Sequence, residues 1–355
     1  MFNKAYVLPI IFAWVTVHNS WAQQEAPYNP IPLMQAEDFD EKKGYHFLVF
    51  GDSKHSAHLQ GVLRQSDKLD PDFCLTTADL VDKGAGPHGV LEYQMLEDTA
   101  GWFFRKYATW TTLGNHEIYD SNRHANYQSG AKNFADFFGL SDPTYSFDFA
   151  NARFIAMDWP EIDKDPDKLV WLENELKSAQ GKHIFVFRHR PFYTVGTKSH
   201  FEIDGKPSLS TKLFEKYHVS AVFSGHDHIY YRTFRDQVYY VISAGAGAFI
   251  YPLDRESEAI NGDVYYGRMA GRSAAGKLFN SFKYRHASGQ ETFLEEALYY
   301  LVSVKVKGNR IKIRMIDSGG KVWDSFSFKN RHVDEANWKP TFRYYQDPER
   351  LEADH

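Results

Sequence analysis

The sequence predicts a mixed α/β (α+β) fold in which a two-sheet β-sandwich is flanked by helices. From residue 45 onward, strand-like runs alternate with segments whose apolar residues recur at helical spacing. Hairpin signals bound this alternation, at 144–158, 230–243 and 299–317. The chain of 355 residues is 43% hydrophobic and 16% aromatic, so it has enough apolar surface for a large core and is not a disordered chain.

The first elements follow from these patterns in order. Strands are expected over 45–50, 73–77 and 108–113. Leu59, Val62 and Leu63 at helical spacing predict a helix over 57–69. Further helices are expected over 90–107, where Gly101 is an interruption, and over 131–138. Alternating runs over 144–149 and 153–158 predict a hairpin around the intervening Ala-Asn-Ala.

The later elements carry clearer boundary signals. Asp165-Pro166 starts a helix and Gly181 stops it, and a second helix is expected over 208–217. Strands follow over 183–187, 219–223, 230–234, 238–243, 299–306, 310–317 and 322–328. Residues 253–292 are less regular and are interpreted as an insertion over the active-site face within a domain of residues 45–329, and 330–355 as a polar tail on the surface.

The N-terminus predicts export. Lys4, an apolar run over 7–17 and small residues at positions 20 and 22 are typical of a signal peptide over 1–22, followed by a polar linker over 23–44. An uncleaved anchor is the alternative, but the run is shorter than the about 20 residues a bilayer requires. We therefore expect a secreted or periplasmic protein without a stable membrane span. The one cysteine, Cys74, excludes an intrachain disulfide and is expected to be a buried thiol. A net charge of −5 argues against nucleic-acid binding.

Five polar motifs follow strand-like runs. Where strands end at one edge of a sheet, such turns converge in the crevice that binds ligands. Carboxylates, an amide and imidazoles gathered there suit a pair of divalent transition metals. The motifs, in chain order, are Gly51-Asp52, Ala78-Asp79-Leu80-Val81-Asp82, Gly114-Asn115-His116-Glu117, the isolated His189, and Gly225-His226-Asp227-His228.

The motifs and their order resemble those of the calcineurin-like metallophosphoesterase superfamily. The resemblance covers roughly residues 45–329, which is most of the chain. The local sequence after His228 is most similar to the purple-acid-phosphatase-like branch of this superfamily. It consists of Ile-Tyr-Tyr-Arg, followed further along by residues 241–247. The resemblance implies a sandwich fold, hydrolysis of phosphomonoesters or phosphodiesters, a phosphorylated small-molecule or nucleotide substrate, and two metal ions, with Fe, Zn or Mn as the candidates.

The resemblance also implies roles for single residues. Asp79 would bridge both metals, Asp52 and His228 would bind the first, and Asn115, His189 and His226 would bind the second. His116 would be the catalytic histidine and Asp82 the residue that orients it. Taken singly, each aspartate is more simply a turn residue and each histidine a satisfied core residue. The joint pattern favours the metal site.

One departure from the family pattern concerns the first motif. Many members have Asp-x-His, whereas this chain has Asp52-Ser53-Lys54. Asp82, His55 or His58 could replace the histidine, or the first metal could be weakly held. The departure also motivates an alternative function, a phosphate- or nucleotide-binding protein with a degraded metal site. Further cations near the motifs could contact the substrate phosphate or be solvated strand ends, namely Lys54, Arg188 and Arg190.

Overall fold

The computed structural model describes residues 26–36, 44–157, 164–197, 208–269, 281–334 and 341–346. The predicted signal peptide and residues 23–25 and 37–43 of the predicted linker lie outside these residues. Within the described part of the chain, no helix has the length and apolar character needed to cross a membrane.

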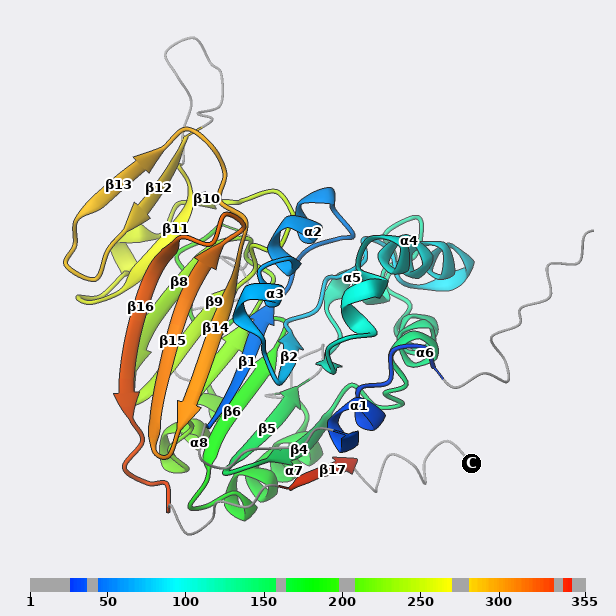
Figure 1. Cartoon of the computed structure of the whole chain (residues 1–355), viewed down its shortest axis with the longest axis horizontal. Helices are drawn as coiled ribbons and strands as arrows, with labels where there is room; N and C mark the ends of the chain where they lie inside the picture. Colours follow the sequence, from blue (N-terminus) through cyan, green and yellow to red (C-terminus); the bar gives the residue numbers. More distant parts are fainter. Residues whose placement is uncertain are drawn as a thin grey trace, which may run out of the picture.

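Two β-sheets face each other, which confirms the predicted sandwich (Figure 1). The smaller sheet has six strands in the order β16-β15-β14-β1-β2-β3. The strands β1, β2 and β3 are parallel neighbours, and the hairpin of β14 and β15 adds antiparallel strands beside β1. The bounds are β1 Tyr45–Phe50, β2 Phe73–Thr76, β3 Thr109–Trp110, β14 Tyr300–Lys307, β15 Arg310–Asp317 and β16 Val322–Lys329.

The larger sheet has eleven strands, and its main path runs β13-β12-β11-β8-β9-β7-β6-β5-β4-β17, with β10 paired to β11. Its centre is parallel, because β5, β6, β7 and β9 run in the same direction. The bounds are β4 Tyr145–Phe149, β5 Ala152–Met157, β6 His183–Arg188, β7 Ala221–Ser224, β8 Tyr230–Arg235, β9 Val238–Ser243, β10 Pro252–Leu253, β11 Val264–Met269, β12 Phe282–Arg285, β13 Glu291–Leu294 and β17 Phe342–Gln346.

Aromatic rings fill the space between the sheets. The Phe47 ring of β1 stacks on Phe73 at 5.4 Å and meets Phe154, Phe185 and Phe223 of the larger sheet edge-on at 5.2–6.1 Å. Such edge-to-face contacts add to the stabilisation from burial alone. The next residues along the same strands point to the opposite face, so the central strands are buried on both sides and appear in the sequence as continuous apolar runs.

Helices cover the outer faces. The helices α2 Ala57–Leu63, α3 Ser66–Leu69, α4 Gly86–Phe104, α5 Asn115–Ile118 and α6 Tyr127–Phe138 lie on the side of the smaller sheet (Figure 1). The pair α7 Pro166–Ser178 and α8 Leu209–Lys216 packs on the outer face of the larger sheet, with Leu172, Leu176 and Phe214 buried against Ile184 and Val186.

Two predictions about the helices differ from the structure. The helix expected over 57–69 is two helices, α2 and α3, and at the break Gln65 Nε2 donates to the Ser318 carbonyl. Gly101 does not interrupt α4, which runs through it, and a Cβ there would lie 2.7 Å from Tyr28 Oη. The glycine therefore allows a close approach between Tyr28 and the helix.

The described parts of the two irregular segments contain regular structure. Within 253–292, the strands β11, β12 and β13 extend the larger sheet beside β8, so this segment is more regular than predicted. In the C-terminal tail, β17 pairs antiparallel with β4. In the predicted linker, Pro30–Ala36 is the helix α1, and Met34 is buried.

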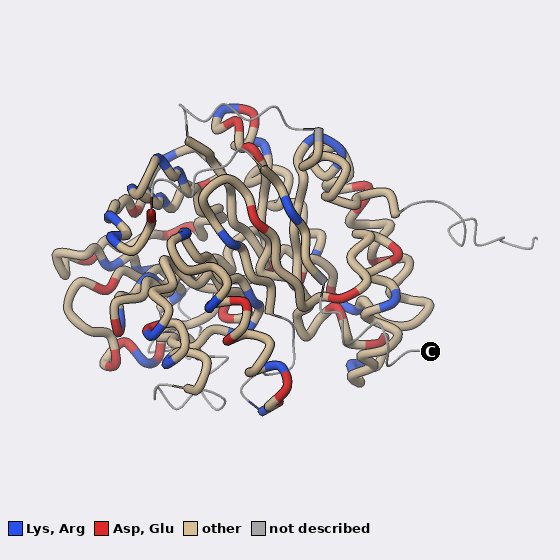
Figure 2. Tube along the Cα trace, turned by 90° about the horizontal axis from the view of Figure 1, so that it is seen from below, with Lys and Arg blue, Asp and Glu red and all other residues tan. Residues whose placement is uncertain are grey.

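The parallel strands direct the polar motifs to one edge of the sandwich. Each motif follows the carboxyl end of β1, β2, β3, β6 or β7. Charged side chains elsewhere are of mixed sign, with basic and acidic residues interspersed along the trace (Figure 2).

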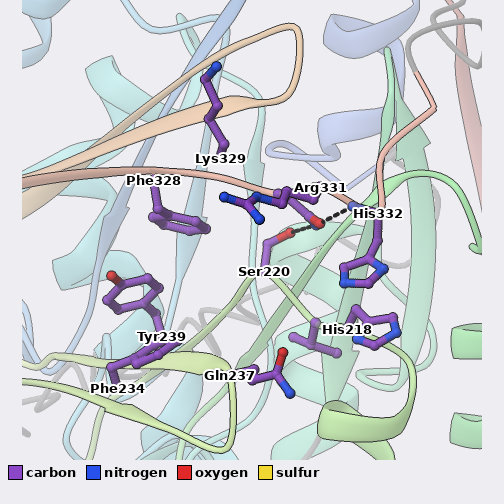
Figure 3. A pocket seen from close by; sticks show the side chains of 11 residues that line it. His218, Ser220, Phe234, Gln237, Tyr239, Phe328, Lys329, Arg331 and His332 are labelled. Atoms are coloured by element: carbon purple, nitrogen blue, oxygen red, sulfur yellow. Dashed lines mark hydrogen bonds between the residues drawn. The ribbon is translucent and has the colours of Figure 1, made fainter.

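A groove of about 310 Å³ lies at the opposite edge (Figure 3). Its floor includes His218 and Ser220, which precede β7, and the rings of His218 and His332 stack at 3.5 Å. Asn330 Nδ2 donates to Ser220 Oγ across it. Because α/β proteins bind ligands at the carboxyl ends of their strands, this groove is not the candidate active site.

Candidate metal centre

The turns that carry the motifs have left-handed backbone conformations. The φ angles are +55° at Asp52, +68° at Ala78, +52° at Asp79 and +70° at His226. Non-glycine residues adopt this region at an energetic cost, and such positions cluster at functional sites. Ala78 and Asp79 therefore form their turn with some backbone strain.

Glu117 holds the Asp79 turn in place. Its carboxylate accepts hydrogen bonds from the backbone N–H groups of Asp79 at 3.0 Å, Leu80 at 2.8 Å and Gly114 at 2.8 Å. Burial, followed by the charge of Asp79, raises the pKa of Glu117 to about 7. The sequence analysis gave this residue no role, although it is the fourth residue of the motif that begins at Gly114.

One group of predicted ligands, here called the Asn115 cluster, consists of Asp79, Asn115, His189 and His226. Asn115 Oδ1 lies 3.0 Å from His189 Nε2 and 2.8 Å from His226 Nδ1. The two imidazole nitrogens are 3.1 Å apart, and Asp79 Oδ1 is 3.3 Å from His189 Nε2. Ligand atoms bound about 2.1 Å from one ion lie roughly 3 Å from each other, and each of these four spacings is close to that value.

Hydrogen bonding fixes which nitrogen of His189 faces the cluster. Its Nδ1 lies 2.8 Å from the Thr77 carbonyl, which can only accept, so Nδ1 carries the proton. Nε2 of the neutral ring is then an acceptor, and it faces the acceptors Asn115 Oδ1 and Asp79 Oδ1. A cation is the partner that such a group of acceptors requires.

The second group, here called the Asp52 cluster, consists of Asp52, Asp79 and His228. Ligand atoms of all three lie within 4.8 Å of one another, and all three residues are buried. His228 Nε2 is 3.2 Å from Asp52 Oδ1. His228 Nδ1 donates to the Phe249 carbonyl at 2.8 Å and the ring stacks on Tyr251 at 4.0 Å, so Nε2 is held toward the carboxylates.

Both clusters share Asp79, and their donor atoms fit two metal ions. The structure thus brings together all six predicted ligands. The six ligands come from five different strand ends, those of β1, β2, β3, β6 and β7. Oxygen and imidazole nitrogen without thiolate suit Fe, Zn or Mn.

Glycines next to the ligands let the turns approach one another. A Cβ at Gly225 would lie 2.4 Å from Asp52 Oδ2, and one at Gly114 would lie 2.3 Å from Asp79 Oδ1. At Gly51 it would lie 2.1 Å from Thr77 Oγ1. Each glycine is required because a ligand, or the turn that bears one, occupies the space of the missing side chain.

Gly225→Ala should therefore weaken metal binding in the Asp52 cluster by about 10-fold or more, because Asp52 must move away from the new methyl group. Equilibrium titration with chelator-buffered Zn²⁺ measures the effect. Gly61→Ala is the matched control, since a Cβ at Gly61 meets nothing closer than Ser318 Cβ at 3.7 Å. Equal Zn²⁺ affinity in the two variants would contradict the prediction.

His116 lies beside the clusters with its ring fixed. Nδ1 is 2.7 Å from the Asp82 carbonyl oxygen and 3.0 Å from Asp82 Oδ1, so Nδ1–H donates to both. Nε2 lies 3.7 Å from Asp79 Oδ2. Burial lowers the pKa of His116, but the charge of Asp79 and the hydrogen bond to Asp82 outweigh it and the pKa is raised. The hydrogen bond from His116 lowers the pKa of Asp82 to about 2.

The three candidates for the missing ligand are placed elsewhere. His55 Nε2 is 2.7 Å from Glu92 Oε2, and the His58 ring stacks on Tyr299 at 3.9 Å. Asp82 contacts His116 and lies outside the Asp52 cluster. Neither histidine is therefore positioned as a substitute ligand, and Asp82 takes the orienting position.

The predicted phosphate-binding cations separate into two kinds. Lys54 Nζ lies 3.9 Å from Asp82 Oδ1, beside His116. Arg188 is buried and stacks over the Phe192 ring at 4.3 Å, and Arg190 is also buried. Arg123, which the sequence analysis did not name, lies 3.5 Å from Asp82 Oδ2 through Nη2.

Comparisons with known proteins agree with this geometry. The model of the family described as calcineurin-like phosphoesterase matches residues 45–230. Purple acid phosphatase 22 of Arabidopsis thaliana is 26% identical over 200 residues, which cover 52% of this chain and 44% of that protein. The predicted resemblance to calcineurin-like phosphoesterases, and to purple acid phosphatases among them, is confirmed.

Two solved structures share the fold. Purple acid phosphatase PPD1 from yellow lupin (Lupinus luteus) seeds has a TM-score of 0.59 at 15% identity and covers 84% of this chain and 56% of its own. GAP50, the anchor in the inner membrane complex of Plasmodium, has a TM-score of 0.56 at 14% identity, covering 83% and 93%. The chain thus spans about half the length of the two purple acid phosphatases, and the structural likeness establishes the fold alone.

Proposed function

The chain belongs to the calcineurin-like phosphoesterase family, and on that premise we propose that it hydrolyses phosphomonoesters or phosphodiesters with the help of two metal ions. The observation that carries the proposal is the pair of buried ligand clusters that share Asp79. The substrate would be a phosphorylated small molecule or nucleotide. Export is proposed from residues 1–22 alone.

The residues of the two clusters would hold the metals. Asp52, Asp79 and His228 would bind one ion, and Asp79, Asn115, His189 and His226 the other. Bound metal ions supply a nucleophilic water at neutral pH and stabilise charge on the phosphoryl oxygens. The two carboxylates offset the charge of the ions, while the neutral imidazoles add donors without adding negative charge.

His116 would donate a proton to the leaving oxygen. Its Nδ1–H is held by Asp82, so Nε2 is the nitrogen that faces the phosphoryl group beside Asp79. A proton on Nε2 can pass to the leaving alkoxide, and the positive ring stabilises the developing charge before transfer. Lys54, which lies near Asp82, would contact a phosphate oxygen, whereas Arg188 is better placed to pack against Phe192.

A metal-reconstituted activity screen tests the proposal. The purified chain is stripped of metal, loaded separately with Mn²⁺, Zn²⁺, Co²⁺ or Fe, and assayed on an aryl phosphate and a bis-aryl phosphodiester. Inductively coupled plasma analysis of the same samples counts the bound metal. Two bound ions with turnover of either ester support a phosphoesterase, and the absence of turnover with all four metals overturns it.

The alternative function is a phosphate-binding protein with a degraded metal site, and it is motivated by the Asp52 cluster, which has one side-chain ligand fewer than the Asn115 cluster. That protein would bind one ion or none and would hydrolyse neither ester. The same screen therefore separates the two functions.

We expect the Asp52 cluster to bind its metal more weakly than the Asn115 cluster, because it has three side-chain ligands instead of four. Chelator titration with metal counting should show one ion lost well before the other. Lys54 comes two residues after Asp52 and its charge would repel a cation at short range, so Lys54→His should tighten the weaker site by removing that charge and adding a nitrogen donor. Loss of both ions together, unchanged in Lys54→His, would show that the two sites are equally strong.

A further inference from the structure

Three basic side chains meet at the single carboxylate of Asp82. His116 Nδ1 lies 3.0 Å from Oδ1, Lys54 Nζ 3.9 Å from Oδ1, and Arg123 Nη2 3.5 Å from Oδ2. Lys54 and Arg123 are cationic side chains, so two positive charges gather with His116 on this rim of the site. Both lie on the Asp82 side of His116, the proposed proton donor.

The backbone under Arg123 is firmly held. Asp120 Oδ1 accepts hydrogen bonds from the N–H groups of Asn122 at 2.8 Å and His124 at 2.9 Å, and the Arg123 N–H donates to the Asp120 carbonyl at 2.9 Å. Tyr119 and Ala125 pair across the base of the loop. The loop is therefore a closed turn that fixes the position of the Arg123 Cα.

This turn is joined to the catalytic elements. It follows α5, which carries Asn115 and His116, and Asn126 N–H donates to the Ile118 carbonyl at 2.7 Å. The segment after Asp82 is tied to the same unit, because Gly84 N–H donates to the His116 carbonyl at 2.8 Å and Ala85 N–H to the Tyr119 carbonyl at 3.0 Å. Arg123, Asp82 and His116 thus belong to one hydrogen-bonded unit.

The Arg123 side chain, in contrast, is able to change partner. It is 59% exposed, and its contact with Asp82 is long at 3.5 Å. A guanidinium presents paired N–H donors that match two oxygens of a phosphate group. A phosphate group bound beside His116 would offer further acceptor oxygens to this guanidinium, while His116 keeps its contact with Asp82 Oδ1.

Phosphomonoesters and phosphodiesters differ in charge, and this difference determines which of them basic side chains bind more tightly. A phosphomonoester carries a charge between about −1.5 and −2 at neutral pH because its second pKa is near 6. A phosphodiester has no second ionisable oxygen and carries one charge. The additional charge and the additional free oxygen of the monoester are what Lys54 and Arg123 can bind.

We propose that Arg123, together with Lys54, binds the additional anionic oxygen of a phosphomonoester and makes the site prefer monoesters to diesters. The inference rests on the proposed phosphoesterase function and names the substrate class of that site. On binding, Arg123 exchanges Asp82 for the phosphate oxygen, while Asp82 keeps its hydrogen bond with His116. Arg123 acts here as a substrate-binding residue and takes no part in proton transfer.

Steady-state kinetics on matched esters test the proposal. Arg123→Gln should lower kcat/KM for an aryl phosphate by about 10-fold or more, since a hydrogen bond between charged groups is lost, and should change it for the bis-aryl diester by less than about 3-fold. Arg123→Lys should recover part of the monoester loss. Lys132→Gln is the control, because it removes one charge from an exposed residue of α6 that pairs with Asp136.

The outcomes separate this inference from the proposed function. Equal losses on both esters, no loss on either, or a wild-type preference for the diester would overturn the role of Arg123 while leaving a phosphoesterase. If the metal-loaded wild type hydrolyses neither ester, the proposed function fails.

The role of Arg123 is then tested by calorimetry with inorganic phosphate and with dimethyl phosphate. Arg123→Gln should weaken the binding of inorganic phosphate by about 5-fold or more and leave the affinity for dimethyl phosphate unchanged. Parallel changes for both anions would overturn it.

Discussion

Asp79→Asn should reduce hydrolysis of an aryl phosphate by about 10³-fold or more and should lower the metal content of both clusters. Asp79 is the residue the clusters share, and its Oδ1 lies 3.3 Å from His189 Nε2 while also accepting the His116 N–H at 3.0 Å. The amide has the same shape as the carboxylate but lacks its charge. The two ions would then be balanced by Asp52 alone, and one amide oxygen would have to serve both.

A buried aspartate away from the site provides the matched control. Asp263 accepts hydrogen bonds from Tyr231 Oη at 2.7 Å and from the Ile260 N–H at 2.9 Å. Asp263→Asn should cost stability but should leave kcat and the metal count unchanged. The two variants are compared by metal analysis, turnover and thermal unfolding on the same preparations. Turnover of Asp79→Asn within about tenfold of the wild type would mean that Asp79 is not the shared ligand.

The strands and the ligand positions could be predicted because their signals are local. The run 45–50 is apolar apart from His46 because both faces of β1 are buried, and Asp52 in the following turn comes two residues after it. Parallel strands then bring the turns to one edge, and the resemblance to the phosphoesterase family selected the ligand set Asp52, Asp79, Asn115, His189, His226 and His228 from the polar residues there.

The residues that hold the ligands could not be predicted because their partners are distant in sequence. Thr77 orients His189 through a carbonyl 112 positions away, and Phe249 orients His228 through its own carbonyl. Every residue has a main-chain carbonyl, so the sequence does not indicate which carbonyl orients a given histidine. Glu117 was named only as part of its motif, since its role depends on the backbone N–H groups of Asp79 and Leu80.

The same limit explains why three ligand alternatives stayed open until the structure was known. His55 is next to the first motif, and sequence proximity favoured it, but its ring is paired with Glu92 of α4. His58 lies on α2 and faces Tyr299, at the edge of β14. Arg123 shows the opposite case. It is far from Asp82 in sequence and was not predicted, but the closed turn at 119–125 brings it near Asp82 in space.

His116→Gln should reduce kcat by about 10²–10⁴-fold with little change in metal content, because the proton donor is lost and no ligand is. The structure adds a comparison with Asp82→Asn. His116 Nδ1–H donates to the Asp82 backbone carbonyl at 2.7 Å as well as to the carboxylate at 3.0 Å, and the carbonyl survives any change of the side chain.

The tautomer and ring orientation of His116 should therefore persist in Asp82→Asn, and kcat should fall by no more than about 10-fold. Single-turnover assays of the leaving-group step on the two variants measure the difference. An aryl ester with a good leaving group sharpens the test, since a phenol of low pKa leaves without a proton and should hide most of the His116→Gln defect. Equal losses in the two variants would show instead that the carboxylate, and not the main-chain carbonyl, holds the histidine in its catalytic form.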